Sequence, residues 1–229
     1  MLEGKTVLVA GGSSGIGLAV AGLARENGAH VIVASRNAVK QGDRLADLIG
    51  ERVETRSFDI TSDESVRGLV REVGSIDHLV IAVRSDSRSS LFLETDMAEA
   101  RKIFETKLWG SFRLIGAVKT HVVQQGSIVL TSGIAGEKVY RGTSAMAMVN
   151  SAVEALCRSL ALELAPLRVN AVSPGFVEPK PREIEEYAAQ FPCNRLASPR
   201  DVAMAYHHLM VNPYVTGTIA VVDGGARLV

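Results

Sequence analysis

A glycine-rich stretch near the start of the chain has the composition of a phosphate-binding turn. It follows an apolar run at 5–9 and precedes a segment in which apolar residues recur at helical spacing. Glycines let the backbone approach a ligand closely, and the N–H groups at a helix N-terminus attract phosphate. The spacing, G-x-x-x-G-x-G, differs from the G-x-G-x-x-G dinucleotide fingerprint, so the alternative is a turn that uses glycine for its geometry alone. From the strand–turn–helix context we predict dinucleotide contacts at Gly11, Ser13, Ser14, Gly15, Ile16 and Gly17.

The residues after the second and third apolar runs indicate which dinucleotide would bind. An acidic residue at the end of the second strand would bind the 2′-hydroxyl of NAD, but this chain has Ser35 and Arg36 there. A hydroxyl and a guanidinium suit a 2′-phosphate, so we expect NADP(H) in preference to NAD(H), unless Arg36 is only an exposed loop residue. Asp59, after the third run, is placed to contact the adenine amino group. The alternative is that Asp59 belongs to a helix start near Thr61.

The composition and charge of the chain exclude several classes of partner. The 229 residues carry 25 basic and 25 acidic side chains, for a net charge of +0. This balance argues against a nucleic-acid-binding surface and a basic membrane-binding patch. Cys157 and Cys193 have no metal or redox spacing, and no histidine has ligand spacing, so we expect no metal. The first strand begins soon after Met1 and no apolar run approaches about 20 residues, so we expect a cytoplasmic protein without signal peptide or membrane span.

Seven short apolar runs alternate with segments of helical pattern along the whole chain. The runs cover 5–9, 29–34, 53–58, 76–83, 127–130, 168–172 and 218–222. Several are apolar without alternation, as strands are when helices cover both faces of a parallel sheet. Helix starts are marked by Thr61 with Glu64, by Asp96 with Glu99, and by Ser198 before Pro199. We predict one α/β domain over 1–229, with a doubly wound parallel sheet flanked by helices.

Five motifs along the chain occur together in one known family. They are the Gly11/Gly15/Gly17 turn, Asp59-Ile60, the stretch 168–175, the stretch 214–217 and the stretch 222–225. With them the chain resembles the short-chain dehydrogenase/reductase family. The resemblance implies a single-domain, seven-stranded Rossmann fold, a nicotinamide cofactor, a small-molecule substrate and a homo-oligomer, either a dimer or a homotetramer. It makes 176–196 the substrate-covering segment and extends the expected cofactor contacts to Ile60, Ala82, Val83, Lys107, Pro174, Gly175 and Val177.

The catalytic positions of that family hold other residues in this chain. The tyrosine position holds Met146, and the lysine position, four residues later, holds Asn150. The serine position falls on Gly133 and the asparagine position on Lys107. Methionine cannot donate a proton, and asparagine carries no charge that would lower the pKa of a neighbour. The usual proton transfer from tyrosine is therefore excluded at these positions.

Three residues are candidates to replace the missing acid. Lys107 has mainly apolar neighbours at helical spacing, so an inward ammonium would have a lowered pKa and could protonate an alkoxide or hold the nicotinamide ribose. Otherwise Lys107 reaches the surface or pairs with an acid. Ser132 ends the fifth strand and could bind a carbonyl or only satisfy the backbone there, and Tyr140 could swing over the site or only pack. Arg84 replaces a glycine near the cofactor, where it contacts phosphate or an acidic substrate, or fills the substrate's space.

These observations leave three functional hypotheses. The first is an NADP(H)-dependent oxidoreductase that interconverts a carbonyl and an alcohol, with Lys107 as an atypical proton donor helped by Ser132 or Tyr140. The second is a sensor or scaffold that binds a cofactor or ligand without redox turnover, because the family's catalytic set is absent. The third is a lyase or isomerase that reuses the same pocket.

Overall fold

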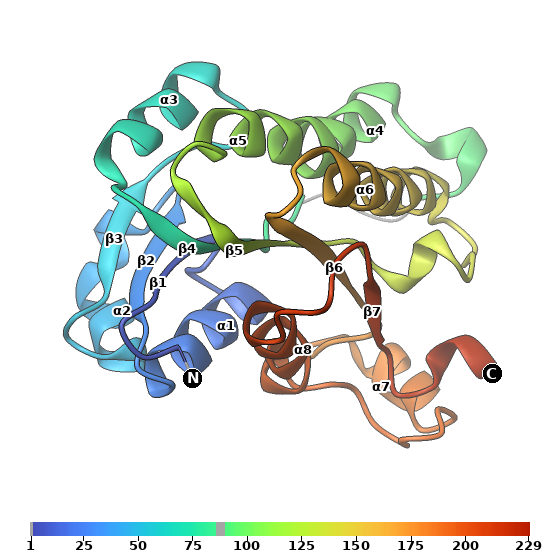
Figure 1. Ribbon diagram of the computed structural model, residues 1–229. Coiled ribbons are helices and arrows are strands. Elements are labelled where there is room, and N and C mark those ends of the chain that lie inside the picture. Colours follow the sequence, from blue (N-terminus) through green and yellow to red (C-terminus); the bar gives the residue numbers. More distant parts are fainter. Residues whose placement is uncertain (1, 86–89) are drawn as a thin grey trace.

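A seven-stranded parallel sheet forms the centre of the molecule (Figure 1). The computed structural model describes residues 2–85 and 90–229. The strands lie in the order β3-β2-β1-β4-β5-β6-β7, and each neighbouring pair is parallel. Their bounds are β1 Thr6–Ala10, β2 His30–Ser35, β3 Glu54–Ser57, β4 Ile76–Ile81, β5 Val122–Thr131, β6 Arg168–Pro174 and β7 Ile219–Val222. The predicted seven-stranded Rossmann fold is confirmed.

The apolar runs mark the strands well because both faces of the sheet are covered. In β4, Leu79, Val80 and Ile81 are each buried, although successive side chains point to opposite faces. Only β5 differs clearly from its predicted run, because it begins at Val122 instead of residue 127. The added residues include polar side chains that hydrophobic patterning does not detect.

Helices cover the two faces as separate layers (Figure 1). One face carries α3, α5 and α6, whose apolar residues join one core cluster, and the other carries α1, α2 and α8, which join a second. The helix bounds are α1 Gly15–Glu26, α2 Gly42–Ile49, α3 Asp63–Glu72, α4 Met97–Phe104, α5 Gly110–Val118, α6 Ser144–Glu163, α7 Arg182–Ala188 and α8 Pro199–Val211. Within the described residues, α6 alone is long and apolar enough by length and composition to cross a membrane, a test that core helices also pass.

Two of the three predicted helix starts are confirmed, and one is shifted by a residue. Ser198 and Asp201 form a reciprocal capping box at α8, and the Asp96 carboxylate accepts the N–H of Ala98 at 2.8 Å. The prediction that Thr61 caps α3 is wrong, because Ser62 is the cap. Thr61 instead donates its hydroxyl to the Asp59 carboxylate at 2.7 Å, which removes it from the helix start.

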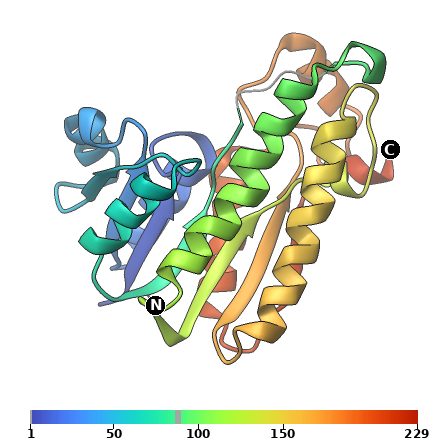
Figure 2. The same cartoon turned by 90° about the horizontal axis from the view of Figure 1, so that it is seen from above.

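The sheet order places a ligand crevice between β1 and β4. The order reverses there, so the chain leaves the carboxyl ends of these two strands toward opposite faces, and open α/β sheets bind ligands at such a switch point. Figure 2 shows the α4–α5 stretch and α6 side by side across one face of the sheet. Their ends at the carboxyl edge therefore lie next to the crevice.

Candidate active site

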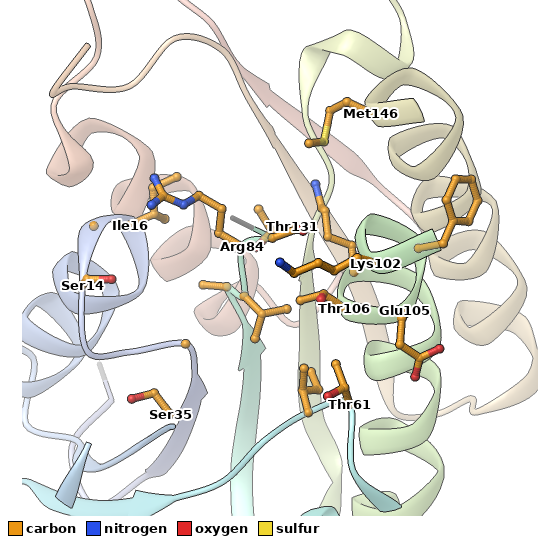
Figure 3. A pocket seen from close by; sticks show the side chains of 18 of the residues that line it. Ser14, Ile16, Ser35, Thr61, Arg84, Lys102, Glu105, Thr106, Thr131 and Met146 are labelled. Carbon is orange, nitrogen blue, oxygen red and sulfur yellow. The ribbon is translucent and has the colours of Figure 1, made fainter. Parts of the chain in front are cut away.

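One large cavity lies along the carboxyl ends of the strands (Figure 3). Its volume is about 1640 Å³, and its walls include the ends of β1, β2, β4, β5 and β6. Every predicted cofactor contact except Gly17 lines it. The sequence motifs, which are far apart along the chain, therefore meet around one space that is large enough for a dinucleotide together with a substrate.

The glycine turn forms the wall of the cavity at the start of α1. Gly11 has φ +84°, and a Cβ there would lie 2.6 Å from the carbonyl oxygen of Ala82. A Cβ on Gly17 would lie 2.3 Å from the carbonyl oxygen of Gly11, so Gly17 closes the turn from behind instead of facing the cavity. The turn thus needs glycine for close backbone packing, and it leaves the N-terminus of α1, at Gly15, beside the cavity. This arrangement fits a dinucleotide diphosphate.

Polar and cationic side chains line the end of the cavity expected to hold the adenosine. The Ser35 hydroxyl donates to the Ser13 hydroxyl at 2.9 Å, and Arg36 and Arg44 lie exposed along the same wall. Asp59 lines the cavity, and its carboxylate also accepts hydrogen bonds from the backbone N–H and the hydroxyl of Thr61. Asp59 therefore has both a position at the cavity and a local structural role. Burial acts to raise the pKa of Asp59, but the hydrogen bonds from Thr61 and the charge of Arg36 bring it below its usual value.

Lys107 is buried inside the protein, in a π-helical turn between α4 and α5. The turn covers Glu105–Trp109, and Lys107 is only 8% exposed. Its ammonium donates to the carbonyl oxygen of Ser132 at 3.0 Å and to Oδ1 of Asn150 at 2.6 Å. The surface-reaching and acid-paired alternatives are therefore wrong for this side chain. Burial lowers the pKa of Lys107 to about 8.

The ammonium of Lys107 keeps bonding capacity for a ligand. A lysine has three N–H donors, and the two acceptors at Ser132 and Asn150 use two of them. Lys107 also lines the cavity. One N–H can therefore point at a bound molecule while the neutral acceptors hold the nitrogen in place.

Asn150 packs closely against Gly133 on one side and forms a hydrogen bond with Lys107. A Cβ at Gly133 would lie 2.9 Å from Nδ2 of Asn150, which is closer than such atoms come. A serine at 133 would therefore collide with the asparagine that holds the lysine. In the sequence, Asn150 only replaces the family's lysine. The structure shows that it also forms a hydrogen bond with Lys107.

The other two candidate acids are placed differently from Lys107. Ser132 lines the cavity, but its hydroxyl donates to the Glu154 carboxylate at 3.1 Å, and its carbonyl oxygen is the group that holds Lys107. Tyr140 is not among the residues that line the cavity. Its ring packs edge-on against Phe176, with centroids 5.4 Å apart, and burial raises its pKa to about 12. Lys107 is thus the candidate acid whose polar group faces the cavity.

Met146 and Thr131 belong to the remaining wall of the cavity. Met146 faces the cavity from α6 (Figure 3). The Thr131 hydroxyl donates a hydrogen bond to the carbonyl oxygen of Ile81 at 2.6 Å. Within the 176–196 segment, the rings of Tyr187 and Phe191 pack against Phe176. Residues Arg182–Ala188 of that segment form α7.

Comparisons with known proteins agree with this fold. A family model described as enoyl-(acyl carrier protein) reductase matches residues 10–227. A short-chain dehydrogenase/reductase of Stachybotrys chlorohalonatus is 35% identical over 256 residues, covering 99% of this chain and 98% of the relative. A 3-oxoacyl-[acyl-carrier-protein] reductase of Mus musculus is 33% identical over 234 residues, covering 98% of each. The solved structure of a small-chain dehydrogenase in complex with NADPH has a TM-score of 0.84 and 30% identity, covering 98% of this chain and 99% of its own.

The chain therefore belongs to the short-chain dehydrogenase/reductase family. The Stachybotrys chlorohalonatus relative is named as a dehydrogenase/reductase and the Mus musculus relative as a reductase.

Proposed function

We propose that this protein is an NADP(H)-dependent carbonyl reductase in which Lys107 replaces the family's tyrosine as the proton donor. The observation that carries the proposal is the buried Lys107 ammonium, held by two neutral oxygens at the wall of the cavity that fits a dinucleotide. Here the positive charge of the site comes from the helical stretch between α4 and α5 instead of from α6.

The chemistry requires a hydride and a proton. The nicotinamide cofactor supplies the hydride when bound. The Lys107 Nζ would donate its third N–H to the carbonyl oxygen, stabilise the negative charge that develops there, and transfer the proton. With a pKa of about 8, the nitrogen is mostly protonated at pH 7 and releases its proton more readily than an ordinary lysine. Ser132 and Asn150 then hold the neutral amine until it regains a proton from solvent.

The preference for NADP(H) rests on the cationic wall near Ser35. Arg36 stands where an acidic residue would favour NAD, Arg44 lines the same cavity, and a guanidinium suits a phosphate. A related solved structure is described as a complex with NADPH. Relatives named as 3-oxoacyl-[acyl-carrier-protein] reductases suggest a 3-oxo compound as the first substrate class to test.

The decisive experiment measures NADPH oxidation with 3-oxoacyl thioesters and simple ketones and aldehydes, comparing three forms of position 107. Lys107→Asn removes both charge and proton, while Lys107→Arg keeps the charge on a group that does not deprotonate. Loss of a general acid lowers kcat by about 10²–10⁴-fold. We expect both variants to lose kcat to a similar extent, with NADPH binding retained. Full activity in Lys107→Asn would refute the proposal, and activity in Lys107→Arg alone would reduce the role of Lys107 to electrostatics.

A second variant pair tests whether the contact itself carries the function. Asn150→Lys alone places a second ammonium next to Lys107, which is expected to destabilise the protein by charge repulsion. The double variant Lys107→Asn with Asn150→Lys exchanges the two side chains across the same contact. We expect the double variant to fold better than Asn150→Lys, and to reduce carbonyls poorly because Met146 supplies no acid. The exposed Lys119→Gln removes one positive charge, as Lys107→Asn does, and serves as the charge-matched control for that single variant.

A second candidate function is cofactor binding without redox turnover, as in a sensor or scaffold. The thioether of Met146, at the position where the family places its acid, favours it. Tight NADPH binding without turnover of any carbonyl or alcohol would support this function or that of a lyase or isomerase.

We also propose a homo-oligomer and a cytoplasmic location. Trp109, Phe112 and Met148 expose more than half of their surface on α5 and its neighbours, and such apolar side chains suit a contact between subunits. Light scattering of the purified protein tests the oligomer.

A further inference from the structure

Positive charge predominates among the charged side chains that line the cavity. Among the described residues that line the cavity, cationic side chains outnumber carboxylates. The cations are Arg36, Arg44, Arg84, Arg101, Lys102, Lys107 and Lys180, and the carboxylates are Asp59, Glu105 and Glu178. Asp59 and Glu105 are already engaged, with Thr61 and with Arg113.

Two of these cations follow the ends of two different strands. Arg84 follows β4, and in Figure 3 its guanidinium extends toward Ile16, in the first turn of α1. Lys180 follows β6, at the start of the 176–196 segment. Partial burial lowers the pKa of Lys180, and repulsion by Arg84 lowers it further, so the two charges are close enough to interact.

A buried hydroxyl next to Arg84 has no hydrogen-bond partner among the described residues. Ser85 is 6% exposed and lines the cavity, and its Oγ has no hydrogen-bond partner in the part of the chain that the structure describes. A buried hydroxyl without a partner is costly, and such groups in native proteins are commonly satisfied by a ligand or water. The α1 N-terminus adds its positive dipole to the same region.

We propose that Arg84 and Lys180 form a two-sided clamp over the diphosphate of a bound dinucleotide, above the N-terminus of α1. The glycine turn would hold the diphosphate from below through backbone N–H groups, and the two side chains would cover it from above. The anion would also relieve the repulsion between the two cations. This inference rests on the dinucleotide site of the proposed function, but not on hydride transfer.

The clamp is tested by calorimetric binding of NADPH, ADP and inorganic pyrophosphate to the wild type and to Arg84→Gln, Lys180→Gln and the double variant. We expect each replacement to weaken NADPH and ADP binding by about tenfold, the size typical of one charge-assisted hydrogen bond. The double variant should lose pyrophosphate binding altogether, while adenosine, which has no phosphate, should bind all forms equally. Lys119→Gln, a remote cation, should behave as wild type.

Two further measurements keep the outcome clear. Arg84→Lys should recover part of the affinity that Arg84→Gln loses, and circular dichroism should show that every variant folds. Unchanged NADPH and ADP affinity in the double variant, with a raised KM only for acidic substrates, would assign the cations to the substrate and overturn the proposal. Failure of the wild type to bind pyrophosphate or ADP would overturn it too. Absence of turnover with binding intact would count against the proposed reductase activity alone.

Discussion

The burial of Lys107 should be measurable as a pH-dependent cost in stability, and Lys107→Met removes it. The pKa falls from 10.5 to about 8 on folding, which corresponds to about 3 kcal/mol at about 1.4 kcal/mol per pKa unit. Between these two values the unfolded chain holds a proton that the folded chain has released. Raising the pH through this window therefore stabilises the folded wild type, and the methionine variant lacks this gain.

Urea unfolding of both proteins from pH 7 to pH 10.5 tests this value. The free energy of unfolding of the wild type, relative to Lys107→Met, should rise by about 3 kcal/mol between pH 8 and pH 10.5 and stay constant below pH 8. The raised pKa of Cys157 works in the opposite direction, but it is present in both proteins and cancels in the difference. The acceptors left without a donor in the variant, at Ser132 and Asn150, add a cost of about 1–3 kcal/mol that does not vary with pH.

The control for this measurement is Lys119→Met, which removes an exposed lysine and should give a flat difference across the same range. A flat difference for Lys107→Met as well would mean that the ammonium is solvated in solution, and the proposed acid would lose its physical basis.

Two other perturbations address the cofactor preference and the packing around Asn150. Arg36→Ala should remove the preference for NADPH over NADH, seen as converging dissociation constants in a fluorescence titration; equal binding by the wild type would contradict the assignment. Gly133→Ala should lower the unfolding free energy by about 1–3 kcal/mol, because the new methyl group lies 2.9 Å from Nδ2 of Asn150. Asn150→Ala removes an acceptor of the buried Lys107 and is costly by itself, so the test compares backgrounds: added to Asn150→Ala, the change Gly133→Ala should cost much less than in the wild type, and an equal cost in both would place the strain elsewhere.

The fold was predictable from the sequence because its signals are local and repeated. Strands buried on both faces, such as β4, read as continuous apolar runs, and the helix-start residues Asp96 and Ser198 sit where their caps are needed. Thr61 was misassigned because two neighbouring hydroxyl residues can each cap a helix, and only the bond between Thr61 and Asp59 decides between them.

The polar geometry of the site could be predicted only in part. An apolar helix face correctly indicated that Lys107 points inward, but a π-helical turn breaks the regular spacing, so its partners could not be derived from periodicity. The direction of the Ser132 hydroxyl and the packing of Tyr140 depend on contacts between distant segments. The contact between Lys107 and Asn150 joins residues 43 positions apart, which no local pattern encodes.

The lowered pKa of Lys107 also makes the side chain a nucleophile near neutral pH. Near pH 8 about half of the molecules carry a neutral amine with a free lone pair, and a neutral amine in a cavity attacks aldehydes to form imines. The nitrogen that acts as an acid when protonated is thus a nucleophile when it is not. Reductive labelling with an aldehyde, followed by peptide mapping, should therefore modify Lys107 preferentially when the cavity is open, and bound NADPH should protect it.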